Sequence, residues 1–248
     1  LGKFLFENYY DAKGHLTEAR RNNIVVEKYA YDNEGRRVVD YRAWSGGSRY
    51  FIYGFDGALI RVNDAYLEWT PQGRLQAIYS NAERVEYEYG DDTRLDQVYL
   101  HSGVTVQYAY DGSGLMPVRI SEDREPVWQF TWKNRIRLMR CVDIRAGVTY
   151  DFSYGDARIP QSVTMQAQAH AMYRLTGLHA SSLKLRLWAD QIGSVRVLST
   201  SEGRVLKHME YDSFGNLTHE NLTPLHFLPS RPTPPILTLL SLDPYTTK

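Results

Sequence analysis

The chain has 248 residues, 43% of them apolar and 13% aromatic, which is enough apolar surface for the core of one large all-β domain or of two smaller ones. The same composition excludes a disordered chain. Because 29 basic and 29 acidic side chains leave a net charge of zero, neither nucleic acid nor an anionic membrane is expected as a partner. No stretch approaches the ~18 apolar residues of a membrane span.

The sequence offers little for metal or disulfide chemistry. Cys141 is the only cysteine, which excludes an intrachain disulfide and a zinc site built from cysteines. The seven histidines show neither H-x-x-x-H nor H-x-H spacing. We therefore expect no metal and no cofactor.

Strands that end in tyrosine and run into a turn with aspartate and glycine recur from the start of the chain. The motif residues are Tyr10, Asp11 and Gly14; then Tyr29, Tyr31, Asp32, Gly35 and Arg36; then Tyr108, Tyr110, Asp111 and Gly114; and finally Tyr211, Asp212, Phe214, Gly215 and Asn216. Such self-similarity is typical of repeat architectures, whose units bury their faces by stacking on their neighbours.

The copy at residues 104–114 shows the logic of one unit. Val104, Val106, Tyr108 and Tyr110 alternate with more polar residues, which predicts a half-buried antiparallel strand. An aspartate at the first turn position can accept hydrogen bonds from backbone N–H groups two residues on. A glycine three residues later can supply the positive φ that a side chain opposes. We therefore expect turns at Asp32–Gly35, Asp111–Gly114 and Asp212–Gly215, each closing a hairpin.

The aromatic residue before each turn marks the period of the repeat. We take as markers Tyr10, Tyr31, Phe55, Trp69, Tyr89, Tyr110, Trp132, Tyr154 and, after a gap, Tyr211; several successive markers are 21 or 22 residues apart. A second strand is expected after each turn, such as Leu75–Tyr79 after Gly73. Each unit is thus predicted to be a two-stranded hairpin, and the units to form a curved, open, all-β sheet.

Two stretches depart from this pattern. Residues 162–175 are rich in Ala, Gln and Met and fit a helix or a strand, and we favour a strand. Six of the ten prolines fall after Thr223, and proline removes the N–H that a strand ladder needs. We therefore expect a YD-repeat sheet region over residues 1–223 and a Pro-rich irregular tail over 224–248, whose apolar run Ile236–Leu242 could dock on the sheet.

The units resemble the YD repeat of the Rhs (rearrangement hotspot) family, whose core is Tyr-x-Tyr-Asp-x-x-Gly-Arg-Leu. The copy from Tyr29 to Arg36 matches it, with Arg37 in place of the apolar residue, whereas the copy from Tyr108 lacks the arginine. A longer block resembles the D-x-x-G-S-x-R signature near the end of an Rhs core; its residues are Asp190, Gly193, Ser194 and Arg196, followed by the copy from Tyr211 to Asn216. The resemblance covers residues 9–220.

The resemblance implies a structural rather than an enzymatic role. In the Rhs family the repeats build a hollow shell of spiralling β-strands around a C-terminal toxin, and related shells occur in insecticidal toxin complexes and in teneurins. It implies as partners the remainder of the shell and a toxin cargo, which this chain does not contain, and a secreted or cell-surface location. The family's later Gly-rich block is missing, and Asp243–Thr246 alone echoes a later element. The chain is therefore either a fragment or a frameshifted, decayed end.

Two alternatives involve ligands. Exposed Tyr and Trp could bind carbohydrate, as in a cell-surface adhesion module, but a cross-strand aromatic ladder is the favoured reading. Turn carboxylates could make a polysaccharide hydrolase, but turn aspartates more often satisfy backbone donors. Gly193-Ser194 lacks the second glycine of a nucleophile elbow. We therefore expect no catalytic residue, and an open sheet that self-associates through its edges or apolar faces.

Overall fold

The computed structural model describes residues 5–91, 93–155, 159–190, 193–215 and 217–222. The chain divides into two compact units: residues 1–90 with 98–104, and residues 91–97 with 105–248. We call them unit 1 and unit 2 and describe each by itself. No expectation for the tail, including the run Ile236–Leu242, can be compared with the fold, because residues 223–248 lie outside the described part.

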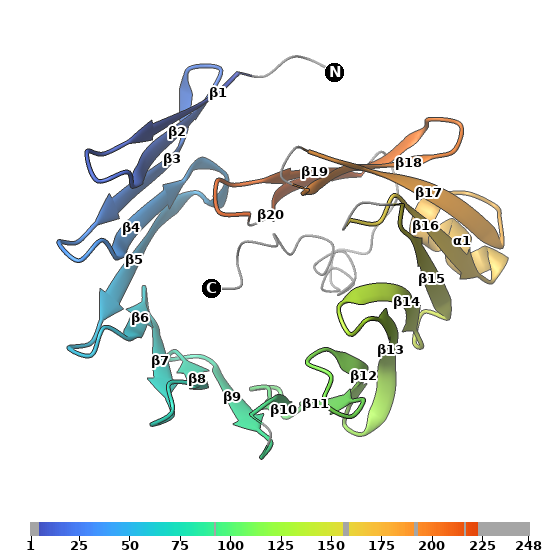
Figure 1. The fold of residues 1–248 in the computed structure, drawn as a ribbon, viewed down its shortest axis with the longest axis horizontal. Helices are drawn as coiled ribbons and strands as arrows, with labels where there is room; N and C mark the ends of the chain where they lie inside the picture. Colours follow the sequence, from blue (N-terminus) through green and yellow to red (C-terminus); the bar gives the residue numbers. More distant parts are fainter. Residues whose placement is uncertain (1–4, 92, 156–158, 191–192, 216, 223–248) are drawn as a thin grey trace. The chain divides into compact units, whose positions relative to one another are not determined.

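Unit 1 is built from short strands that follow one another in chain order (Figure 1). They are β1 (Phe6–Tyr10), β2 (Leu16–Arg21), β3 (Ile24–Tyr31), β4 (Arg37–Arg42), β5 (Gly47–Tyr53), β6 (Leu59–Val62), β7 (Ala65–Trp69), β8 (Leu75–Tyr79) and β9 (Arg84–Tyr89), with a 3-10 turn η1 (Ala43–Ser45) before β5. Each strand pairs antiparallel with the next. β10 (Leu95–Tyr99) is divided between the two units.

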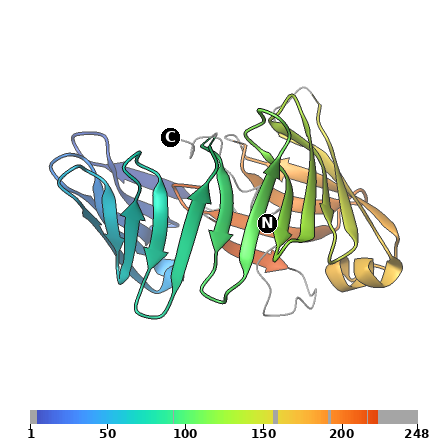
Figure 2. The ribbon, with the colours of Figure 1, turned by 90° about the horizontal axis from the view of Figure 1, so that it is seen from below.

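Unit 2 repeats the same plan. Its strands are β11 (Thr105–Tyr110), β12 (Pro117–Glu122), β13 (Glu125–Lys133), β14 (Arg137–Asp143), β15 (Val148–Ser153), β16 (Ser162–Ala167), β17 (Ser182–Ala189), β18 (Val195–Thr200), β19 (Val205–Tyr211) and β20 (Leu217–Leu222). They also pair antiparallel in chain order, as the alternating arrows in Figure 2 show. The expected all-β architecture of antiparallel hairpins in an open sheet is confirmed.

The stretch predicted as one strand over residues 162–175 is divided. β16 ends at Ala167, and a helix, α1 (Ala169–Thr176), follows. The helix ends at Gly177, which has a left-handed backbone (φ 68°) and donates its N–H to the Tyr173 carbonyl. The strand prediction was therefore wrong for the second half, where good helix formers and a terminal glycine outweigh the β-branched and aromatic residues.

The two kinds of hairpin end use different turns. Turns of the Asp/Gly type alternate with two-residue turns such as Asn22–Asn23 and Asp123–Arg124, whose residues all have positive φ. Positive φ at both central positions defines the type I′ turn, which matches the natural twist of a hairpin and favours Asn and Asp. In addition, Asn22 holds the residue just before β1, because its N–H donates to the Leu5 carbonyl (2.8 Å) and its Oδ1 accepts the Leu5 N–H (2.9 Å).

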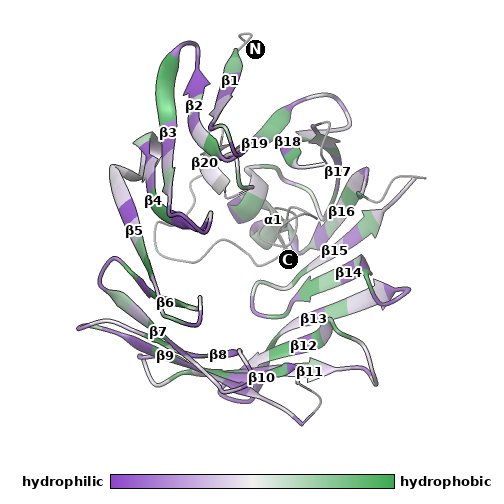
Figure 3. Cartoon of the chain, turned by 60° about the vertical axis from the view of Figure 1, so that its left-hand side comes forward, coloured by the Kyte–Doolittle hydropathy of each residue, from purple (hydrophilic) through white to green (hydrophobic). Residues whose placement is uncertain are grey.

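Apolar and polar residues alternate along the strands of both units (Figure 3), but the buried apolar side chains gather in unit 2. Its core spans β13 to β19 and includes Phe130, Phe152, Leu187 and Met209, with Met172 of α1 packed on it. In unit 1, as far as the structure describes it, the buried apolar residues are Ala19, Tyr29, Ala77 and Val98. Unit 1 must therefore depend more on polar and aromatic contacts between its strands.

Candidate functional site

The Asp/Gly turn is a small hydrogen-bonded structure centred on the aspartate. In the copy after β3, the carboxylate Oδ1 of Asp32 accepts the backbone N–H groups of Glu34 (3.0 Å) and Arg36 (2.8 Å), and its Oδ2 accepts from Nε of Arg36 (2.7 Å). The Gly35 N–H closes the turn on the Asp32 carbonyl at 3.1 Å. Burial alone would raise the pKa of Asp32, but the hydrogen bonds from the side chain and backbone of Arg36 hold it below its ordinary value.

Two other copies keep this arrangement with different partners. After β1, Asp11 accepts the backbone N–H of Lys13 and of His15, and its second oxygen meets Nδ1 of His15 at 3.0 Å. The N–H of His15 is the main reason that the pKa of Asp11 is lowered. After β17, Asp190 accepts the N–H of Ser194 (2.9 Å) and Nε of Arg196 (2.7 Å). The D-x-x-G-S-x-R block is thus a turn of the same type in which the arginine stands two residues further along.

Glycine plays the expected part in most of these turns. Gly14, Gly35, Gly193 and Gly215 all have positive φ, between 79° and 97°. Gly114 does not: the positive φ in that turn belongs to Gly112 (φ 50°), although the Gly114 N–H still closes the turn on the Asp111 carbonyl at 2.9 Å. The D-G-S-G sequence offers two glycines, and the first of them, Gly112, adopts the left-handed backbone conformation.

At eight hairpins, the aromatic residue at or just after the end of the first strand bonds back to the preceding hairpin. Its ring O–H or N–H donates to a backbone carbonyl 10 to 16 residues earlier, at the start of the preceding second strand. The pairs are Tyr31 with Leu16 (2.9 Å), Tyr53 with Arg37 (2.9 Å), Trp69 with Leu59 (2.7 Å), Tyr89 with Leu75 (2.9 Å), Tyr110 with Leu95 (2.7 Å), Trp132 with Pro117 (2.8 Å), Tyr154 with Leu138 (2.8 Å) and Tyr211 with Val195 (3.0 Å). We call each such pair a lock.

An arginine or histidine side chain next to the lock carbonyl covers the ring of six lock tyrosines. The contacts, to the ring centre, are Arg36 on Tyr53 (4.7 Å), Arg74 on Tyr89 (5.5 Å), Arg94 on Tyr110 (4.5 Å), Arg137 on Tyr154 (5.3 Å) and Arg196 on Tyr211 (5.0 Å), while the His15 ring stacks on Tyr31 at 4.7 Å. In cation–π contacts the cation lies over the face of an aromatic ring, and it is more often the guanidinium group of arginine than the ammonium group of lysine. Each of these five arginines therefore joins its own hairpin to the next one.

Seven of the eight locks share one strand register. Ala77 lies opposite Glu86, so counting two residues along each antiparallel strand places Leu75 opposite Glu88, the residue before Tyr89. The same count places the lock carbonyl opposite the residue before the lock aromatic at the junctions β2–β3, β4–β5, β6–β7, β12–β13, β14–β15 and β18–β19. The lock is therefore a fixed registration device between hairpins.

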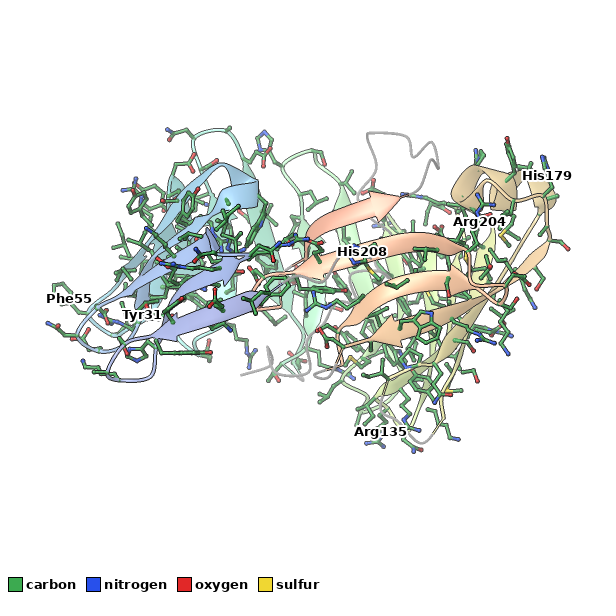
Figure 4. All side chains as sticks on the ribbon, turned by 90° about the horizontal axis from the view of Figure 1, so that it is seen from above. Tyr31, Phe55, Arg135, His179, Arg204 and His208 are labelled. Carbon is green, nitrogen blue, oxygen red and sulfur yellow. The ribbon has the colours of Figure 1, made fainter. Side chains whose placement is uncertain are left out.

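The structure corrects one marker of the repeat. Phe55 stands in the turn after β5 and is fully exposed (Figure 4), while the lock aromatic of that hairpin is Tyr53. In this copy Gly54 takes the place of the aspartate, since the Gly57 N–H closes on its carbonyl at 3.0 Å. Taking Asp56 as the first residue of the turn puts the marker at Phe55, two residues after the lock aromatic Tyr53.

The other predicted motif residues serve different purposes. Tyr29 is buried and donates its hydroxyl to Glu27, Tyr108 is half-buried, and Tyr10 at the end of β1 is 59% exposed. Asp212 is buried and accepts the N–H of Phe214 at 2.9 Å. Asn216 lies outside the described residues. The sequence reasoning missed the lock carbonyls and most of the arginines. Three of these arginines, Arg74, Arg94 and Arg137, carry a readable signal, because each is followed by a leucine 14 to 16 residues before the next lock tyrosine.

A buried ion cluster joins two strands of unit 1, β4 and β5. Asp40 on β4 has no exposed surface, and Arg49 of β5 donates to both of its carboxylate oxygens, at 2.9 and 2.6 Å. Arg42, also buried, reaches Asp40 at 3.3 Å. Burial would raise the pKa of Asp40, but the hydrogen bond from Arg49 and the nearby guanidinium charges hold it lowered. Because Asp40 lies opposite both Tyr29 and Arg49, the cluster runs along one row of the sheet.

These contacts bear on the two ligand hypotheses. Asp11, Asp32 and Asp190 are engaged with backbone and side-chain donors of their own turns, which is the work of a structural aspartate. Six lock tyrosines present one ring face to an arginine or to His15, which leaves less aromatic surface for a sugar. Within the described residues no group of His, Cys, Asp and Glu could hold a metal ion, and no helix is long and apolar enough to cross a membrane.

The chain is similar in sequence to known proteins, although no protein-family model matches it. Teneurin-1 of Mus musculus is 24% identical over 213 residues, which make up 85% of this chain and 7% of the relative. Teneurin-1 of Homo sapiens gives the same identity and the same coverage. The chain therefore spans a small part of these relatives, and its similarity to them extends over most of its own length.

Solved structures give weaker similarity. A crystal structure of TcdB2-TccC3 aligns with 89% of this chain and 14% of that chain at 12% identity, with a TM-score of 0.36. The Photorhabdus luminescens Tc holotoxin pore aligns with 88% of this chain and 13% of that chain, also at 12% identity and a TM-score of 0.36.

Proposed function

We propose that the chain is a non-enzymatic structural segment of an Rhs-type repeat protein and contributes antiparallel strands to the wall of a shell that encloses a toxin cargo. The observation that carries this proposal is the lock, which recurs in one register in both units. A device that adds each hairpin to the one before it suits a protein that extends a sheet by repetition. The similarity to Teneurin-1 over 85% of the chain supports the proposal, because the sequence motif resembles the repeats of both groups.

The finer features of the proposal come from the motif at the end of the chain. The block from Asp190 to Arg196 and the copy at Tyr211 resemble the end of an Rhs core, so we place the segment in the C-terminal part of the repeat core. Residues 1–223 would then form the repeat sheet and residues 224–248 the Pro-rich tail. A secreted or cell-surface location follows from the same resemblance.

Limited proteolysis of the full-length product of the gene, with its natural flanking sequence, tests the enclosure. A shell protects its cargo, so a C-terminal segment should stay intact while a denatured control is digested, because enclosed backbone is out of reach of the protease. As a matched comparison, Tyr211→Phe should open the wall more readily than Tyr50→Phe, which alters an exposed tyrosine outside any lock. Digestion of the C-terminal segment as fast as in the denatured control would contradict enclosure.

Assays of glycan binding and of polysaccharide hydrolysis distinguish the proposed structural role from the two alternatives, a carbohydrate-binding module and a hydrolase. Trp188 (53% exposed) and Tyr50 (58% exposed) are the kind of aromatic side chains that an adhesion module would use. On a glycan array we expect no selective binding, and in turnover assays with polysaccharides no release of sugar. Selective binding that Trp188→Ala abolishes would favour the carbohydrate-binding module, and turnover that Asp32→Asn abolishes would favour the hydrolase.

A further inference from the structure

The sequence contains two Asp-Gly pairs, and the structure places them differently in their turns. In the pair Asp56–Gly57 both polar groups are engaged. The Gly57 N–H closes its turn on the Gly54 carbonyl at 3.0 Å, and Oδ1 of Asp56 accepts the Ala58 N–H at 3.0 Å. The backbone nitrogen and the carboxylate of this pair must therefore each break a hydrogen bond before they can react with one another.

In the second pair, Asp111–Gly112, the same two groups are free. The turn closes two residues later, through the Gly114 N–H, which donates to the Asp111 carbonyl at 2.9 Å. Within the described residues, neither the Asp111 carboxylate nor the Gly112 N–H makes a hydrogen bond. Both residues are exposed, so water reaches them. This turn thus leaves a carboxylate and the backbone nitrogen that follows it without hydrogen bonds.

The other turn aspartates lack this combination. Asp11, Asp32 and Asp190 accept backbone N–H groups, and the residue that follows each of them carries a side chain. Glycine has no Cβ, so its backbone can approach a neighbouring group more closely than that of any other residue. Among these aspartates, Asp111 alone combines an unengaged carboxylate with a following glycine.

We propose that Asp111 converts spontaneously to isoaspartate and that the conversion loosens the neighbouring lock of Tyr110. The Gly112 nitrogen attacks the side-chain carboxyl carbon of Asp111 in its acid form. A C–N bond forms, and the carboxyl hydroxyl leaves with the amide hydrogen as water. Water then adds to the original backbone carbonyl of the succinimide ring and cleaves its bond to the nitrogen. The chain is now joined through the side-chain carbon, with no net change in mass or oxidation state.

The conversion reaches the lock through Arg94. Its Nη1 donates to the carbonyls of Gly112 (2.7 Å) and Gly114 (2.6 Å), and its guanidinium lies 4.5 Å from the centre of the Tyr110 ring. Isoaspartate adds a carbon atom to the main chain and turns the Asp111 carbonyl, which accepts the Gly114 N–H, into a carboxylate. The two carbonyls that hold Arg94 therefore move, and its contact with the ring weakens. The conversion needs this turn and water alone, so it is independent of a role in a shell.

The two Asp-Gly pairs give a matched comparison within one chain. The full chain is kept folded at neutral pH for several weeks, and isoaspartate at each site is measured by electron-transfer fragmentation of its peptides. One hydrogen bond typically changes an equilibrium about fivefold, so Asp111 should react at least about tenfold faster than Asp56, whose pair must break two. In guanidinium chloride, which unfolds both turns, the two rates should be similar. Equal rates in the folded chain, or the same ratio in denaturant, overturns the proposal.

The variant Asp111→Glu tests the effect on the lock. Glutamate keeps the charge, but its longer side chain would have to close a larger ring, so it should form far less isomer. Hydrogen exchange in β10 and β11, measured before and after the incubation, should become faster in the parent chain and stay constant in Asp111→Glu. Exchange in β15 and β16 should stay constant in both. If isoaspartate accumulates at position 111 while exchange in β10 and β11 does not change, the conversion does not loosen the lock.

Discussion

At the scale of single residues, the repeat motif divides its work among a few side chains. The aspartate organises the turn, the glycine supplies a left-handed backbone, the arginine covers the next ring, and the tyrosine hydroxyl reaches the preceding hairpin. Each contact is modest: a hydrogen bond contributes about 1 kcal/mol and an exposed cation–π contact about 0.5–1 kcal/mol. Their repetition along the chain is what makes them decisive.

The tyrosine hydroxyl can be tested on one strand. Tyr53 and Tyr50 both lie on β5, but Tyr53 donates to the Arg37 carbonyl at 2.9 Å whereas Tyr50 is 58% exposed. Tyr53→Phe should lower the free energy of unfolding by about 1 kcal/mol, because a half-buried carbonyl loses its donor. Tyr50→Phe should change it by less than about 0.5 kcal/mol. Urea unfolding measures both, and equal losses would show that the lock hydroxyl has no special role.

The turn glycine gives a second test. Gly35 has φ 79°, and a Cβ there would meet Nε2 of His15 at 3.0 Å. Gly35→Val should cost roughly 1–3 kcal/mol, since a β-branched side chain resists positive φ. Gly35→Asn should cost less, because asparagine tolerates that region. Gly114→Val should also destabilise, but through the Asp111 carbonyl 3.0 Å from the added Cβ. Thermal unfolding of the three variants checks the order, and a neutral Gly35→Val would refute the turn.

At the scale of elements, the hairpins and their register come from patterns that a sequence displays. Alternation in residues 104–110 and the Asp-x-x-Gly turns were enough to predict β11 and its turn. Three features were beyond that reasoning. Tyr53 was missed because Gly54 replaces the usual aspartate, α1 because local propensity was balanced, and the lock carbonyls because a backbone acceptor leaves no mark of its own in a sequence. Asn22–Asn23 did carry the signal of a two-residue hairpin turn.

The Asn22 turn can be tested by exchange. Asn22→Gly keeps the positive φ but loses the side-chain acceptor for the Leu5 N–H, which lies 2.9 Å from Oδ1. Hydrogen exchange at Leu5 should therefore become faster, while exchange in β4 stays the same. Asn22→Ala should in addition destabilise β2 and β3, because alanine opposes positive φ. Unchanged exchange at Leu5 in both variants would show that Asn22 does not hold β1.

The lock also predicts how the hairpins respond to alkali. Burial raises the pKa of Tyr31, Tyr53 and Tyr154 above the ordinary value. A raised pKa in the folded state means that these tyrosines contribute stability that is complete below their unfolded pKa of about 10 and is lost as the pH rises from there through the folded pKa. Circular dichroism should show unfolding above pH 10 at a lower urea concentration than at neutral pH. Constant stability across that range would contradict neutral lock hydroxyls.

At the scale of the whole molecule, the two units differ in what stabilises them. Unit 2 has an apolar core with α1 packed on it, whereas the described interior of unit 1 contains the Asp40 cluster and few buried apolar side chains. Burial of apolar surface contributes about 25 cal/mol per Å², so unit 2 should be the more stable. Hydrogen exchange followed by mass spectrometry should therefore show faster exchange in β3–β8 than in β13–β19. The reverse order would contradict this view of the interior.

The most direct test of the locks is a double-mutant cycle across one junction. Arg74 lies 5.5 Å from the centre of the Tyr89 ring, and the hydroxyl of Tyr89 bonds to the Leu75 carbonyl, so the two side chains join neighbouring hairpins. We predict that Arg74→Ala, Tyr89→Ala and the double variant, compared by urea unfolding, give a favourable coupling free energy of roughly 0.5–1 kcal/mol. Additive losses, with a coupling of zero, would contradict the claim that arginine and tyrosine hold successive repeats together.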